Sequence, residues 1–152
     1  MKRSLSALVC LVCLLGPARA DDGLVTVASI GSVKETIDRL EAAVTAGGAT
    51  VFARVDHAAG AAKVDQALRP TMLLIFGNPK GGTPLMQSRQ TIGLDLPQKA
   101  LAWEDASGKV WLTYNDPGWL AARHGAGPEV AKVVEAQAAA LKAAAAKATA
   151  AP

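Results

Sequence analysis

Seven polar residues lie in three predicted loops, and their types could bind or transform a small molecule. They are Asp56, His57 and Arg69; Asn78, Lys80 and Thr83; and Asp95. Histidine is the side chain best placed to move protons near neutral pH, and arginine pairs well with acidic groups. The set therefore suggests either a ligand pocket or an enzyme site in which His57 is the general base and Asp95 orients it.

The stretch FGNPKGGTPLM (residues 76–86) has the glycine content of a phosphate-binding loop. A nucleoside triphosphatase loop requires a lysine directly before its final Ser or Thr, but Gly82 stands before Thr83 and Lys80 is two residues early. A weaker anion site remains open, because Thr83 and Pro84 can begin a helix whose free N–H groups attract negative charge. The alternative is a plain connection in which Asn78-Pro79 forms a turn.

Each candidate also has a structural interpretation. His57 could be hydrogen-bonded into the loop that follows it, and Arg69 and Asp95 could pair with each other and join two loops. His124 ends a predicted helix before Gly125, where a cation favours the helix dipole. The two histidines with Asp56 or Asp95 could together bind a metal, but no histidine spacing typical of a metal site supports this, and we expect neither a metal nor a cofactor.

The first twenty residues have the pattern of a cleaved signal peptide. Lys2 and Arg3 precede the short apolar run LSALVCLVCLL, and Ala18-Arg19-Ala20 fits a cleavage site. Cleavage after Ala20 would remove both cysteines and lower Lys+Arg from 16 to 13, equal to the 13 Asp+Glu. We therefore expect a periplasmic or secreted protein with no membrane segment after cleavage. A neutral chain without clustered Lys and Arg argues against nucleic-acid binding.

The remaining residues predict alternating strands and helices. Short apolar or alternating runs predict strands over residues 24–30, 50–55, 71–76, 101–104 and 110–114. Ser32 and Glu35 fit a capping box, and Val33, Ile37, Leu40 and Val44 then form one apolar helical face. Further helices are predicted from Thr83 and over GWLAARH, with a turn or two of helix after His57.

After residue 127 the composition changes to an alanine-rich tail. Val130, Val133, Val134, Gln137 and Leu141 could dock as one helical stripe, whereas alanine beyond Leu141 gives helix propensity with little surface to bury. The predicted organisation is a signal peptide (1–20), one domain (21–127) and a helix with a frayed end (128–152). The element order β-α-β-β-α-β-β-α predicts an α+β fold: a single two-layer domain with helices on one mixed, largely antiparallel sheet.

The segments VDHAAGAAKVDQALRPTMLLIFGNPKGGTPLM and GLDLPQKALAWEDASGKVWLTYNDPGWLAARHG resemble the domain of unknown function 302 family. The likeness covers about residues 23–125 and includes D-H, R-P, F-G-N-P and D-L-P in order. It implies a compact α+β domain that forms homodimers, and it implies no established activity. The polar positions that match the family are Asp56, His57, Arg69, Asn78 and Asp95.

The leading expectation is an exported, homodimeric binding or sensing module for a small polar or anionic ligand. Its pocket would gather His57, Arg69, Asn78 and Asp95. One alternative is a small hydrolase- or isomerase-type enzyme that uses His57 and Asp95. The other is an interaction module without a ligand, which would use an exposed strand edge or its C-terminal helix.

Overall fold

The computed structural model describes residues 23–151, and the predicted signal peptide lies outside them. One five-stranded sheet forms the centre, with its strands in the order β1-β5-β4-β3-β2. Their bounds are β1 (Leu24–Ser29), β2 (Thr50–Asp56), β3 (Thr71–Gly77), β4 (Gln98–Glu104) and β5 (Val110–Asn115). The predicted α+β fold is confirmed. Every neighbouring pair of strands is antiparallel, so the sheet is not mixed.

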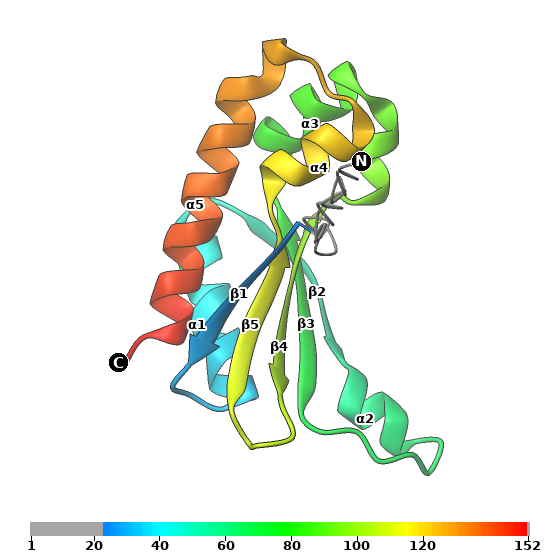
Figure 1. Cartoon of the computed structure of the whole chain (residues 1–152), viewed down its shortest axis with the longest axis vertical. Helices are drawn as coiled ribbons and strands as arrows, with labels where there is room; N and C mark the ends of the chain where they lie inside the picture. The colour runs from blue at the N-terminus through cyan, green and yellow to red at the C-terminus, as the bar shows by residue number, and fades with distance from the viewer. Residues whose placement is uncertain (1–22, 152) are drawn as a thin grey trace, which may run out of the picture.

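Two long helices, α1 (Val33–Ala46) and α5 (Ala131–Thr149), cover one face of this sheet (Figure 1). The predicted capping box begins α1: Ser32 Oγ accepts a hydrogen bond from Glu35 N, and Glu35 Oε2 accepts one from Ser32 N. The predicted apolar stripe is also confirmed, because Val33, Ile37, Leu40 and Val44 are all buried.

The core lies between these helices and the strand residues that face them. Ile37, Leu40, Leu74 and Leu112 are completely buried, and burying a side chain of this size contributes about 1.5–3 kcal/mol. Helix α5 adds alanines rather than large side chains, with Ala144, Ala145 and Ala148 in the same cluster. The predicted frayed end after Leu141 is therefore wrong. Small residues let α5 approach α1 closely, and the helix continues to Thr149.

Helix α3 (Pro79–Ser88) begins five residues earlier than the predicted start at Thr83 and Pro84. Asn78 is the N-cap, because its side-chain oxygen accepts a hydrogen bond from Lys80 N at 2.9 Å, and Pro79 takes the first helical position. The glycine-rich stretch is consequently a helix rather than a loop. Pro84 lies inside it and does not start it.

The remaining elements lie at the two ends of the sheet (Figure 1). Helix α3, the short helix η1 (Gln90–Leu94), α4 (Pro117–His124) and η2 (Pro128–Val130) gather at the upper end. Helix α2 (His57–Ala62) extends away from the lower end. As predicted, α4 ends at Gly125, which takes the left-handed conformation with φ 65°. The molecule therefore has a closely packed upper end and a projecting lower arm.

Candidate functional site

A cavity of about 370 Å³ lies where α1, α3 and α5 meet the upper end of β2 and β3. Its volume is at the lower end of the range of about 300–1,000 Å³ that is usual for ligand sites. The largest apolar side chains in its wall are Phe52, Phe76, Met86, Leu96, Pro97 and Leu141. The polar side chains are Asn78, Thr83, Gln98 and Gln137, and none of the charged residues between Gly23 and Ala151 lines the cavity. This apolar site differs from the predicted polar pocket.

A bulge in β2 helps to form the wall. The register between β2 and β3 shifts between Val51 and Ala53, and Phe52 lies at this shift and lines the cavity. Beyond the bulge Arg54 pairs with Leu74, which places both on the face that carries α1. Arg54 there forms ion pairs with Asp38 at 2.7 Å and Glu41 at 2.5 Å. The bulge thus places an aromatic ring at the cavity and an arginine against α1.

The hydrogen bonds of Asn78 prevent an anion from binding at the start of α3. Its Oδ1 accepts a hydrogen bond from Lys80 N, and its backbone carbonyl accepts hydrogen bonds from Gly81 N and Gly82 N. Its Nδ2 donates to Gly48 O at 2.8 Å, which ties α3 to the turn after α1. The N–H groups that a phosphate or carboxylate would need at this helix start are therefore already used. The segment that resembled a phosphate loop forms one wall of an apolar cavity instead.

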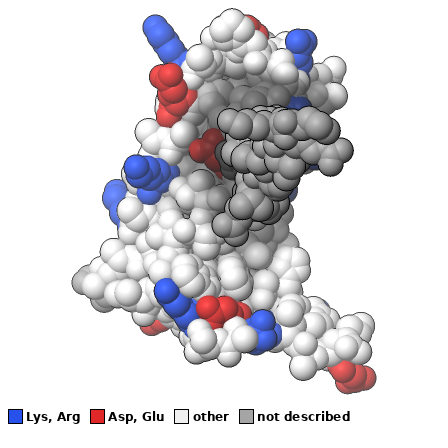
Figure 2. Space-filling view, viewed as in Figure 1, with Lys and Arg blue, Asp and Glu red and all other residues white. Residues whose placement is uncertain are grey.

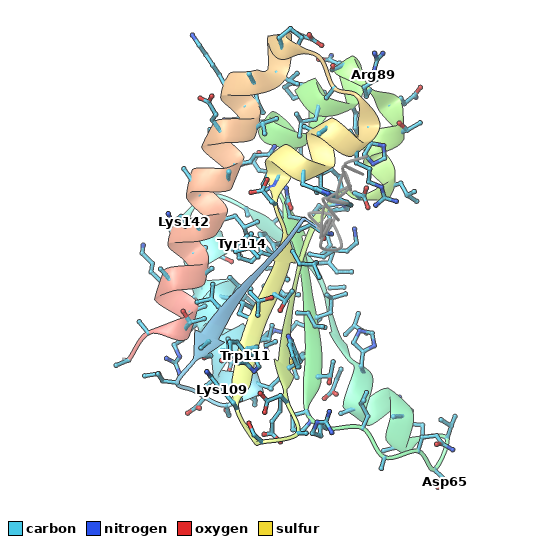
Figure 3. The ribbon with its side chains drawn as sticks, viewed as in Figure 1. Asp65, Arg89, Lys109, Trp111, Tyr114 and Lys142 are labelled. Atoms are coloured by element: carbon cyan, nitrogen blue, oxygen red, sulfur yellow. The ribbon has the colours of Figure 1, made fainter. Side chains whose placement is uncertain are left out.

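The structure divides the predicted site residues between two ends of the sheet. Strand β3 runs from the loop that contains Arg69 to Asn78, and a seven-residue strand rises about 20 Å. Asp56, His57 and Arg69 lie at the lower end, near the arm that ends at Asp65 (Figure 3). Asn78, Lys80, Thr83 and Asp95 lie at the upper end, towards Arg89. Only Asn78 and Thr83 contribute to the cavity.

The lower-end residues make structural contacts. Asp56 is the N-cap of α2, and its Oδ1 accepts from Ala59 N at 2.8 Å. Arg69 Nε donates to the carbonyl of Glu104 at 3.0 Å rather than pairing with Asp95. The His57 side chain is exposed and makes no hydrogen bond within residues 23–151. Within one chain, Asp95 therefore does not contact or orient His57.

Asp95 pairs with the other histidine. His124 Nε2 lies 2.6 Å from Asp95 Oδ2, Thr91 Oγ1 lies 3.1 Å from His124 Nδ1, and Arg123 Nη1 reaches the same carboxylate at 3.2 Å. The sequence predicts His124 as the last residue of a helix, with metal binding alongside His57 as the alternative, and it does not predict this contact. The missed cavity residues are Gln98 and Gln137, which are 39 positions apart in the chain and hydrogen-bonded to each other. No local sequence pattern indicates the His124–Asp95 pair or the Gln98–Gln137 pair.

Between Gly23 and Ala151, no group of three or more Cys, His, Asp and Glu side chains is placed to hold a metal ion. No helix in that range is long and apolar enough to cross a membrane. On the face shown in Figure 2, blue and red side chains are interspersed over a largely white surface. The part of that face outside the grey atoms carries no continuous basic patch.

Residues 25–147 match the sequence profile of the family described as "Domain of unknown function DUF302". The chain belongs to the DUF302 family. The match includes most of α5, which the sequence analysis had placed outside the domain. The fold agrees with the crystal structure of an uncharacterized conserved DUF302 protein from Bacillus stearothermophilus. The TM-score is 0.75 at 19% identity, over 84% of this chain and 98% of that one.

Curated relatives carry a different name. The chain is 63% identical over 107 residues to a protein of Brucella suis biovar 1 named "Fluoride-specific ion channel FluC 1". It is equally similar to the protein of that name in Brucella abortus biovar 1. The matched part covers 70% of this chain but only 42% and 40% of those proteins. The chain thus spans about two fifths of the length of these relatives.

Proposed function

We propose that this DUF302 protein is an exported small-molecule binding or sensing module whose site is the apolar cavity between α1, α3 and α5. The observation that carries this proposal is the cavity itself, with a volume of about 370 Å³ and a wall to which residues 23–151 contribute no charged side chain. A concave apolar site with a few polar groups is the usual form of a ligand site. Enzyme activity has less support, because His57 and Asp95 lie at opposite ends of the sheet.

The experiment uses the neutral fluorophore 1-aminoanthracene, whose emission rises in an apolar site. We expect the full chain to bind it saturably. Gly82 lines the cavity, and a β-carbon there would lie 3.8 Å from Leu96 Cδ1 and 3.9 Å from Met86 Cε, which is ordinary contact. Gly82→Leu therefore places a side chain in the cavity without backbone strain, and should weaken binding at least tenfold.

The matched control is Gly60→Leu in α2, where a β-carbon would meet nothing within 4 Å. It should leave the affinity for the fluorophore unchanged, and circular dichroism should show that both variants are folded. Absence of saturable binding to the unsubstituted chain would refute the proposal. Equal binding by Gly82→Leu would place the fluorophore elsewhere and also count against it.

The proposed module is a homodimer that meets its partner through the uncovered face of the sheet. Strand register places Leu73, Leu101 and Trp111 on the face opposite α1 and α5, and all three are only half-buried. Apolar surface of this kind marks interaction sites. We expect a dimer in analytical ultracentrifugation, which Leu101→Glu should dissociate and Ala143→Glu, on the exposed side of α5, should not. A monomeric unsubstituted chain at micromolar concentration would contradict this.

A second candidate function is that of an interaction module beside a membrane channel, which the 63% identity to part of the Brucella proteins favours. The channel activity in their name would then belong to the rest of those proteins. The test is to delete the matching 107 residues from the Brucella suis protein and measure fluoride efflux from liposomes. Efflux that persists, together with co-purification of the separated domain, would support this role; loss of all efflux would oppose it.

Export is tested separately. N-terminal sequencing of the protein recovered from its native compartment should begin at Asp21, after cleavage of the predicted signal peptide. A protein recovered with Met1 or Lys2 at its N-terminus would contradict export by this route.

A further inference from the structure

Two glutamine side chains form a polar line across the otherwise apolar cavity. Gln98 begins β4 and Gln137 lies in the middle of α5, and both line the cavity. Gln98 Nε2 donates to Gln137 Oε1 at 3.1 Å, and Gln137 Nε2 donates to the carbonyl of Gly81 at 2.9 Å. The line therefore connects the sheet, α5 and α3, which enclose the site together with α1.

Glycine at position 81 permits this line. A β-carbon on Gly81 would lie 3.0 Å from Gln137 Nε2, which is closer than nearly all real contacts. A residue with a β-carbon at position 81 would require the Gln137 amide to shift by a few tenths of an ångström. Gly81 therefore lets the Gln137 amide come close to the start of α3 in the cavity wall.

The two amides keep hydrogen-bonding capacity that the described chain does not use. A glutamine amide has two N–H donors and one carbonyl acceptor. Of these, one N–H of each glutamine and the oxygen of Gln98 have no protein partner among residues 23–151. No side-chain N or O atom among residues 23–151 is both buried and unpaired, so the Gln98 oxygen stays in contact with water. A ligand that displaces this water must supply a hydrogen-bond partner in its place. The free groups include both donors and an acceptor, which suits a hydroxyl or a carbonyl.

Charge would be disfavoured at the same place. The described part of the chain places no charged side chain in the cavity wall, and Asn78 accepts hydrogen bonds from the N–H groups at the start of α3. A carboxylate or an ammonium group would lose its water there and gain only neutral amide contacts. The volume of about 370 Å³ holds roughly a dozen water-sized groups, so the part of a ligand inside the cavity has about that many non-hydrogen atoms.

We propose that the cavity binds an uncharged amphipathic molecule, with an apolar body and one hydroxyl or carbonyl that bonds to the amides of Gln98 and Gln137. This inference rests on the proposed function and specifies its ligand class. It replaces the anionic ligand that the sequence suggested, because the geometry offers neutral partners only. A medium-chain alcohol such as decan-1-ol represents the class and has about the right size.

The test measures displacement of 1-aminoanthracene from the full chain by decan-1-ol, decanoate and decylammonium. Decan-1-ol should compete at least tenfold better than either charged molecule. Gln98→Leu and Gln137→Leu should each weaken the binding of decan-1-ol about three- to tenfold, which is the usual effect of losing one neutral hydrogen bond. Both variants should still bind the fluorophore. Gln87→Leu, on the exposed side of α3, is the matched control and should change neither affinity.

Two results would overturn the inference. Decanoate that competes as well as decan-1-ol would show that charge is accepted, and unchanged affinity for decan-1-ol in both glutamine variants would show that the amides do not contact it. These results leave fluorophore binding intact, so they differ from a failure of the proposed function, in which the unsubstituted chain does not bind the fluorophore.

Discussion

His124 Nε2 lies 2.6 Å from Asp95 Oδ2, and this contact joins the last turn of α4 to the loop that follows η1. The two side chains retain only 9% and 15% of their exposure. The carbonyl of Asp95 also accepts a hydrogen bond from Lys99 Nζ at 3.0 Å. Asp95 therefore connects three segments of the upper end, next to the loop that supplies Leu96 and Pro97 to the cavity.

Asp95→Ala should destabilise the fold by about 1.5–3 kcal/mol, because it removes charge-assisted hydrogen bonds and leaves His124 largely shielded without its partner. Urea unfolding followed by circular dichroism measures this. Lys34→Ala is the control: it breaks an ion pair with Asp38 in which Lys34 is 73% exposed, and such pairs contribute about 0.2–1 kcal/mol. A cost for Asp95→Ala no larger than that of the control would mean that the contact does not stabilise the fold.

Features that are set by residues a few positions apart could be predicted from the sequence, whereas contacts between distant residues could not. The Ser32–Glu35 capping box, the α1 stripe and Gly125 are defined within a few residues, and all three are present in the structure. The His124–Asp95 contact joins positions 29 apart, and it forms only because α4 folds back over η1. Sequence places residues in loops, but strand order and direction decide which loops meet. For this reason His57, which begins α2, and Asp95, which directly follows η1, do not form one site.

Helix α3 shows a second limit, because two starts compete in one stretch. Asn78-Pro79 and Thr83-Pro84 both fit the preferred beginning of a helix. The earlier start has an additional long-range contact, the hydrogen bond from Asn78 Nδ2 to Gly48 O. Local preference does not separate the two, and the tertiary contact is absent from any pattern. The alanine tail was misread for a related reason, since close helix packing makes alanine useful there.

Asn78→Ala should cost about 1–2 kcal/mol, because it removes the cap of α3 and the bond to Gly48 O together. Asn78→Ser keeps a cap oxygen but has no donor that reaches Gly48, so its cost should be about half as large. Thermal or urea unfolding of the three proteins gives the comparison. Equal stability of Asn78→Ala and the unsubstituted chain would show that α3 begins at Thr83 after all.

Ala145→Leu should destabilise the fold by about 1–3 kcal/mol. Ala145 is only 1% exposed and lies in the cluster between α1, α5 and the sheet, so added methylene groups must push the helices apart. Ala143→Leu, on the exposed side of the same helix, makes the same chemical change in solvent and should be neutral. Urea unfolding distinguishes the two. Identical stabilities would indicate that the end of α5 is not packed on α1.

Asp105 in the β4–β5 turn should make the fold sensitive to acid. Its Oδ1 accepts from the Ser107 hydroxyl at 2.6 Å and from the backbone N–H groups of Ser107 and Lys109, and its Oδ2 accepts from Trp111 Nε1 at 2.8 Å. The hydrogen bonds from Ser107 and Trp111 hold the pKa of this carboxyl well below its usual range. The folded state therefore binds the proton more weakly than the unfolded state does.

A carboxyl whose pKa is lowered by folding stabilises the fold above its unfolded pKa of about 4, and this stabilisation is lost as the pH falls. Asp105→Asn should therefore lower the urea concentration at the midpoint of unfolding at pH 7. The difference in this midpoint between the variant and the unsubstituted chain should shrink between pH 4 and pH 2. Glu135→Gln, on the exposed side of α5, is the control and should show little difference at any pH. Tryptophan fluorescence follows both unfolding and the Trp111 contact. A difference between Asp105→Asn and the unsubstituted chain that stays constant from pH 7 to pH 2 would show that the turn is held by its backbone, and that the ionised carboxylate adds nothing.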